Sequence, residues 1–221
     1  MQTDDAFRIY LALRKIYLKE DTNLCFLEFE NPFQILIMTI LSAQTTDKNV
    51  NSVKNALFSK YPDCKSLASA DILEVEEIIK STGFYHAKAK HIISASQMLS
   101  ENYGCFVPKT IDELVKLPGV GRKTANIVLN HAYGINEGIA VDTHVKRLSV
   151  RLGFTKNNDP DKIENDLKSL FKKSVWGEIN FLLISHGRLV CKAKNPSCAV
   201  CKIKKMCRYY QNESKLKKNN T

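Results

Sequence analysis

Four cysteines near the C-terminal end of this 221-residue chain have the spacing that most clearly indicates chemistry. They fall within 17 residues, in the pattern C-x6-C-x2-C-x5-C, and are Cys191, Cys198, Cys201 and Cys207. In an intracellular protein, such clustering indicates a metal centre rather than disulfides. Four thiolates can close a tetrahedral zinc site or hold a four-iron, four-sulfur cluster, and the spacing alone favours neither.

Positive charge is concentrated in the same part of the chain. The net charge is +10, and residues 186–221 carry ten basic residues against one acidic residue, Glu213. This predicts a polyanionic partner, with nucleic acid as the leading candidate. Lys192 and Lys194 lie between the first two of the four cysteines, where metal ligands would hold them in place for phosphate contact. Charge balance against the thiolates is the alternative for these two lysines, and a solubilising tail is the alternative for residues 215–218.

A glycine-containing turn, residues 117–121, precedes the two basic residues Arg122 and Lys123. Gly119 and Gly121 permit unusual backbone angles and leave N–H groups bare at the positive end of the next expected helix. We therefore expect both glycines and Arg122 to bind a phosphate, with a purely structural turn as the alternative. A helix N-terminus disfavours an ammonium, so Lys123 is a candidate nucleophile able to form a Schiff base; a phosphate clamp is its simpler interpretation.

A carboxylate that could assist Lys123 is Asp142, which follows the apolar residues 139–141 and precedes an expected helix. Its commonest use at such a position is as the N-cap of that helix. A capping role does not exclude catalysis, because a carboxylate fixed at the start of a helix is well oriented.

The elements that must position these residues are helical almost throughout. The expected helices span residues 4–19, 33–43, 47–61, 72–81, 86–103, 111–116, 122–133, 143–152, 161–172 and 176–190. Residues 139–141 are the only strand candidate and are too few to build a sheet. We therefore predict an all-α protein of about ten helices. The remaining cysteines, Cys25, Cys64 and Cys105, are interpreted as small buried side chains.

Composition excludes several classes of protein. Apolar residues make up 44% and charged residues 25% of the chain, which are ordinary values for a globular protein. The longest mostly apolar run, residues 33–41, is shorter than the roughly 20 residues that a membrane-spanning helix needs. The first residues lack the pattern of a secretion signal. We expect a cytoplasmic protein with no membrane partner.

Taken together, these motifs resemble those of the endonuclease III family of DNA glycosylases, within the helix–hairpin–helix superfamily. The resemblance covers about Pro32 to Cys207. It depends on residues 41–47 (LSAQTTD), 83–85 (GFY), 117–126 (LPGVGRKTAN), 141–144 (VDTH), 186–188 (HGR) and the four cysteines. It implies a six-helix barrel with the hairpin over residues 25–136, and a helical domain of residues 1–24 and 137–221 that carries a [4Fe–4S] cluster. It also implies a DNA-binding cleft between these domains.

The resemblance implies a monomeric base-excision-repair enzyme that removes oxidised or ring-saturated pyrimidines from damaged double-stranded DNA and then acts as an abasic-site lyase. Lys123, assisted by Asp142, would attack the sugar, form a Schiff base and cut the strand by β-elimination. Gln44 would fill the gap left by the flipped base, and Phe84, after Gly83, would wedge the opposite side. Core packing is the alternative for Phe84. The alternative functions are a mismatch glycosylase for uracil or thymine opposite guanine, and a non-catalytic DNA-binding module with a structural metal.

Overall fold

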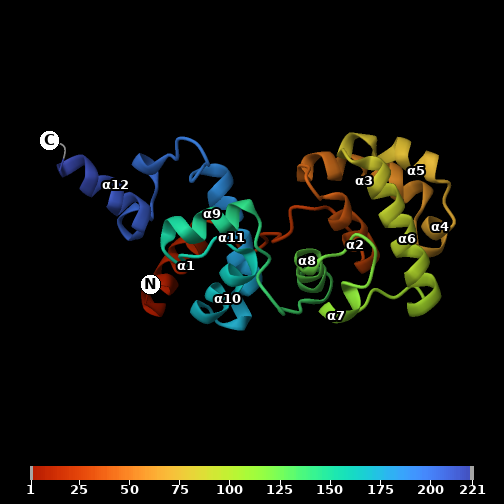
Figure 1. Ribbon diagram of the computed structural model, residues 1–221, viewed down its shortest axis with the longest axis horizontal. Helices are drawn as coiled ribbons and strands as arrows, with labels where there is room; N and C mark the ends of the chain where they lie inside the picture. The colour runs from red at the N-terminus through yellow and green to blue at the C-terminus, as the bar shows by residue number, and fades with distance from the viewer. Residues whose placement is uncertain (1, 220–221) are drawn as a thin grey trace. The chain divides into compact units, whose positions relative to one another are not determined.

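The computed structural model describes the backbone of residues 2–219 and the side chains of residues 2–214 (Figure 1). This part of the chain holds twelve α-helices and no strand, so the all-α prediction is confirmed. All ten expected helices are present, with each end within two residues of its expected position. The strand candidate, residues 139–141, is irregular, and the N–H of Ile139 donates to a carboxylate oxygen of Glu164 at 3.1 Å. None of the described helices is both long enough and apolar enough to cross a membrane.

The chain divides into two compact units. One is Cys25–Glu137, called the hairpin unit below, and the other, called the cysteine unit, combines the segment up to Leu24 with the segment from Gly138 onward. The hairpin unit contains α2 (Pro32–Leu41), α3 (Asp47–Lys60), α4 (Cys64–Ala68), α5 (Ile72–Ile79), α6 (Tyr85–Tyr103), α7 (Ile111–Leu114) and α8 (Arg122–Tyr133).

Helix α2 lies at the centre of the hairpin unit. Asn31 caps its start by accepting a hydrogen bond from the N–H of Gln34, and Pro32 occupies the first turn. Every residue from Phe33 to Leu41 is buried. Helices α3, α6 and α8 pack against α2, and Figure 1 shows α8 beside it. The start of α8, where Lys123 lies, is therefore held in place by the packing of α8 against the buried helix α2.

Two of the three scattered cysteines meet in this core. Cys64 is buried, whereas Cys25 and Cys105 are partly buried against the core. The Cys64 thiol donates to the carbonyl of Ser96 at 3.2 Å and interacts with the side chain of Cys105. Burial raises the pKa of Cys64 to about 12, so this thiol stays protonated at neutral pH.

The cysteine unit is built around α11 (Trp176–Leu189), which buries nine of its residues. Helices α1 (Thr3–Tyr17) and α9 (Thr143–Leu152) pack against α11, and α10 (Pro160–Leu170) packs against α9 and α1. After α11, two single turns of 3₁₀-helix, Cys198–Val200 and Lys204–Met206, carry the cysteine-rich segment to α12 (Arg208–Asn219). The side chains of residues 215–218, expected to form a basic tail, lie outside the described residues.

Sequence periodicity missed α4 and α12. Helix α4 has only five residues, too few for a periodic pattern. It forms because Asp63 and Ser66 make a reciprocal capping box, in which each side chain bonds the other's backbone N–H. Helix α12 is strongly polar, so its sequence has little apolar periodicity to read.

Candidate active site and cysteine centre

The turn before α8 depends on two glycines in different ways. Gly119 has a φ of +78°, and a Cβ added there would lie 2.9 Å from Cβ of His91 and 3.1 Å from Cγ2 of Ile40. Gly121 has an ordinary φ of −95°, and an added Cβ would meet nothing within 4 Å. Gly119 therefore lets the turn approach α2 and α6 closely, whereas packing within the hairpin unit places no such demand on Gly121.

The start of α8 is open to an anion. Gly121 is its N-cap, and because glycine has no side chain it supplies no capping hydrogen bond there. Gly121, Arg122 and Lys123 are all exposed. Helix N-terminal N–H groups without a side-chain acceptor, at the positive end of the helix dipole, can bind a phosphate oxygen.

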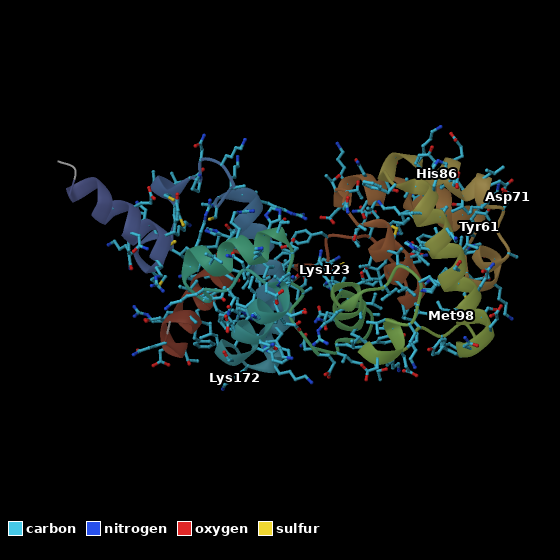
Figure 2. All side chains as sticks on the ribbon, in the orientation of Figure 1. Tyr61, Asp71, His86, Met98, Lys123 and Lys172 are labelled. Carbon is cyan, nitrogen blue, oxygen red and sulfur yellow. The ribbon has the colours of Figure 1, made fainter. Side chains whose placement is uncertain are left out.

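Lys123 lies on the exposed side of the first turn of α8 (Figure 2). Two and three residues further on, Ala125 and Asn126 turn into the core and are buried. The buried side fixes the helix, so the amine of Lys123 is presented to solvent from a well-anchored backbone. An exposed amine at a helix N-terminus can reach an electrophilic carbon of a bound ligand.

The two side chains expected to enter DNA share an unusual backbone conformation. Gln44 has a φ of +53° and Phe84 a φ of +49°, both in the left-handed region. Residues other than glycine adopt this region rarely and at an energetic cost. Both side chains are exposed, Phe84 to 67%, which excludes core packing for its ring. The fold thus holds two exposed residues in costly conformations, which is typical of functional positions.

Asp142 is the N-cap of α9. Its side chain accepts a hydrogen bond from the N–H of Val145 at 2.7 Å and is partly buried. The helix behind it is held closely: a Cβ added at Gly187 of α11 would lie 2.8 Å from Nδ1 of His144 and 3.0 Å from Nη2 of Arg147. This close helix contact gives a packing reason for the glycine in the HGR motif, and it fixes the backbone that carries Asp142.

The four clustered cysteines line one cavity, together with apolar side chains that include Leu152, Val190 and Ile203. Burial raises the pKa values of the thiols of Cys198, Cys201 and Cys207. Their thiolates therefore require a compensating positive charge inside the cavity.

The four cysteines line one cavity without gathering around a single point. Among the described residues, no three His, Cys, Asp or Glu side chains are grouped closely enough to hold one metal ion. A tetrahedral zinc site would bring all four sulfurs to about 2.3 Å from one centre. A cavity lined by four separated thiols fits a larger group with several metal atoms.

Two arginines of α9 hold the segment that carries Cys191. Arg147 donates to the carbonyl of Cys191 at 3.0 Å and to that of Gly187 at 3.0 Å. Arg151 donates to the carbonyl of Lys192 at 2.7 Å and to Sγ of Cys191 at 3.3 Å. Neither arginine was identified from the sequence, although their i, i+4 spacing on the helix that Asp142 caps places them on one face.

Two further contacts surround the thiols. Nε2 of His186 lies 3.6 Å from Sγ of Cys201, and Nδ1 of the same ring lies 2.8 Å from the hydroxyl of Tyr17. Lys192 and Lys194 lie in the first cysteine loop with both side chains exposed. The loop is therefore anchored through its backbone and its sulfurs, which leaves the two ammonium groups available for a ligand.

Comparison with known proteins gives concordant matches. The sequence profile of the HhH-GPD superfamily of base excision DNA repair proteins matches residues 37–173. Endonuclease III of Synechocystis sp. is 48% identical over 202 residues, which is 91% of each chain. Two solved structures, a non-covalent endonuclease III–DNA complex and a trapped endonuclease III–DNA covalent intermediate, align with TM-scores of 0.90 and 0.89. Each is 38% identical and covers 97% of this chain and 99% of its own.

Proposed function

Because the chain belongs to the endonuclease III family of HhH-GPD base excision DNA repair proteins, we propose that Lys123 is its nucleophile and Asp142 the assisting carboxylate. The protein is a DNA glycosylase and abasic-site lyase that binds DNA. The observation that carries the assignment of Lys123 is its exposed position on the first turn of α8, beside an uncapped helix start that can bind the neighbouring phosphate.

The chemistry requires a neutral amine. Lys123 gives up a proton, with Asp142 accepting or orienting it, and its Nζ then bonds to the anomeric carbon of the deoxyribose. The bond from that carbon to the base breaks, and the base leaves with the electron pair and gains a proton. The sugar ring opens to a Schiff base on Lys123. Loss of a proton from the neighbouring carbon then expels the 3′ phosphate, which is the β-elimination step.

The DNA contacts follow from the exposed residues of each unit. In the hairpin unit, the N–H groups after Gly119 and Gly121 bind a phosphate together with Arg122. Gln44 fills the space left by the flipped base. Phe84, which follows Gly83, wedges beside that space. In the cysteine unit, Lys192 and Lys194 bind further phosphates. We propose double-stranded DNA with an oxidised or ring-saturated pyrimidine as the substrate, a monomer as the active form and the cytoplasm as its location.

The four clustered cysteines are proposed to hold a [4Fe–4S] cluster. Their separated thiols around one cavity, and the raised pKa values of three of them, suit a cationic group with several iron atoms. When bound, such a cluster supplies four iron–thiolate bonds that cross-link the chain from Cys191 to Cys207. Arg147 and Arg151 support that loop from α9, so the exposed lysines beside Cys191 remain in place for DNA.

Borohydride trapping on a duplex with a single abasic site tests the assignment of Lys123. The native protein is expected to give a covalent protein–DNA adduct, because borohydride reduces the Schiff base to a stable amine. Lys123→Ala is expected to abolish the adduct, whereas Lys116→Ala, which removes another exposed lysine on the other side of the turn, should preserve it. An adduct of native yield with Lys123→Ala would overturn the assignment.

Asp142→Asn tests the carboxylate separately from the helix cap. Asparagine is as good an N-cap as aspartate, so α9 should keep its start and its stability. We expect base excision in single-turnover assays to fall at least 100-fold. A rate within twofold of native would show that Asp142 serves only as a capping residue.

A panel of duplexes, including uracil and thymine opposite guanine, tests the proposed preference for damaged pyrimidines.

A further inference from the structure

A lysine without an assigned role is buried beneath the turn that carries Phe84. Lys88 lies in the first turn of α6 and is only 3% exposed. Lysine side chains are rarely buried to this extent, because burying the ammonium costs free energy. No carboxylate among the described residues pairs with it, and burial lowers its pKa. The ammonium donates instead to the backbone carbonyl of Thr82, at 2.7 Å.

Lys88 contacts the Gly83–Phe84 turn from both sides. Its ammonium binds the carbonyl of Thr82, the residue before the turn, and its backbone N–H donates to the carbonyl of Phe84 at 3.1 Å. Between these two bonds lie two consecutive residues with positive φ, Gly83 at +67° and Phe84 at +49°. One residue thus brackets the whole left-handed turn.

The other side of the turn is fixed as well. Thr82 is 1% exposed, and its hydroxyl donates to the carbonyl of Ile79 at 2.7 Å. It ends the 3₁₀ turn Lys80–Thr82, and a cation is favourable beside carbonyls at the end of a helical segment. Phenylalanine does not favour a left-handed conformation by itself, so it persists only where surrounding contacts impose it.

We propose that Lys88 is a positioning residue for base excision, which holds the Gly83–Phe84 turn so that the exposed ring of Phe84 enters the DNA stack when the damaged base leaves it. The proposal rests on the proposed function of Phe84 as the wedge. Lys88 touches neither the reacting atoms nor DNA, and it acts through Phe84. Its loss should therefore impair extrusion of a base more than the chemistry at a sugar that has already lost its base.

A double-mutant cycle tests this proposal with four proteins: native, Lys88→Met, Phe84→Ala and the double variant. Single-turnover base excision from a lesion duplex is compared with β-elimination on a duplex that already contains an abasic site. Fluorescence of 2-aminopurine beside the lesion reports unstacking. Lys90→Met is the matched control, because Lys90 is an exposed lysine on the same helix.

Lys88→Met is expected to lower base excision and the fluorescence change about tenfold, with β-elimination and Lys90→Met both within twofold of native. In the Phe84→Ala background, Lys88→Met should cost nothing further. Native excision by Lys88→Met, or an undiminished additional loss in the double variant, would overturn the positioning role. Native excision by Phe84→Ala alone would instead overturn the wedge itself, so the two failures are distinguishable.

A second variant keeps the test decisive if Lys88→Met does not fold, as judged by circular dichroism. Lys88→Gln retains a donor that can point toward Thr82 but removes the charge. It is expected to show a two- to fourfold loss of base excision that disappears in the Phe84→Ala background. A native rate for Lys88→Gln, or a loss that is the same with and without Phe84, would overturn the proposal.

Discussion

The hairpin unit and the cysteine unit hold the residues that we propose to contact DNA by different means. At the turn before α8, backbone geometry and core packing fix the chain. Gly119 fits against His91 and Ile40, and the helix itself supplies the N–H groups. In the cysteine-rich segment most residues are exposed, and the backbone depends on Arg147, Arg151 and the four thiols. The first site is a property of the fold, whereas we expect the second to require the proposed cluster.

This difference has an energetic origin. The turn before α8 contains Leu117 and Val120, both buried in a core shared with α2, so its conformation is stabilised by apolar burial. The segment from Cys191 to Cys207 buries few side chains, Ile203 and Cys207 among them. With so little apolar burial, we expect this loop to gain order from the proposed metal ligation, because binding of a metal is coupled to folding.

Loss of one proposed cluster ligand should therefore have the largest effect, and only in the cysteine unit. In Cys198→Ser, we expect tryptic cleavage after Lys192, Lys194 and Lys202 to accelerate more than 100-fold, because the loop opens when its cross-link is lost. The purified variant should also lose the yellow-brown colour of an iron–sulfur protein. Cys25→Ser, which changes a partly buried cysteine of the hairpin unit, is the control and should keep both properties. An unchanged cleavage rate in Cys198→Ser would remove the contrast between the units.

The two glycines of the turn should respond to the same substitution with effects of different size. Gly119→Ala introduces a Cβ against His91 and Ile40 at a positive φ, so we expect it to lower the free energy of unfolding by about 2–4 kcal/mol. Gly121→Ala has room and an ordinary φ, and it should change the free energy of unfolding by less than about 0.5 kcal/mol. Urea unfolding of both variants provides the measurement.

The same two glycine variants distinguish an effect on folding stability from an effect on DNA binding. If Gly121→Ala weakens DNA binding while its unfolding free energy stays native, the backbone at the start of α8 approaches a phosphate closely. Equal destabilisation by the two substitutions would show that the turn is not fixed by packing at Gly119.

Much of the fold could be predicted from sequence because its signals are local. Periodic apolar residues, Asn31-Pro32 at the start of α2 and glycines at helix ends mark ten helices to within two residues. Helix α4 was not predicted because a capping box, rather than periodicity, defines it. Residues 139–141 look like a strand by composition, but one short apolar run has no partner strand among the described residues.

The site was less predictable, because its support comes from residues distant in sequence. Nothing near Lys88 in the sequence indicates that its ammonium lies on the Thr82 carbonyl rather than in solvent. The bonds from Arg147 and Arg151 to residues 191–193 span more than 40 positions. The sequence also does not indicate a left-handed φ at Gln44 or Phe84, since neither residue type favours it. Motif spacing can nominate residues that touch a ligand, but the groups that hold them in place require the three-dimensional structure.

The smallest expected effect concerns single phosphates at the edge of the cysteine unit. The backbone of Lys192 is anchored by Arg151, while its ammonium is exposed. Lys192→Ala should therefore leave the loop intact and remove one phosphate contact, which lowers the slope of log affinity against log salt concentration by about one. Lys172→Ala, at an exposed lysine of the same unit after α10 (Figure 2), should leave the slope unchanged. Equal slopes for native protein and Lys192→Ala would mean that anchoring this loop does not serve DNA binding through Lys192. The cysteine centre would then contribute to the stability of its own unit rather than to phosphate contact at this position.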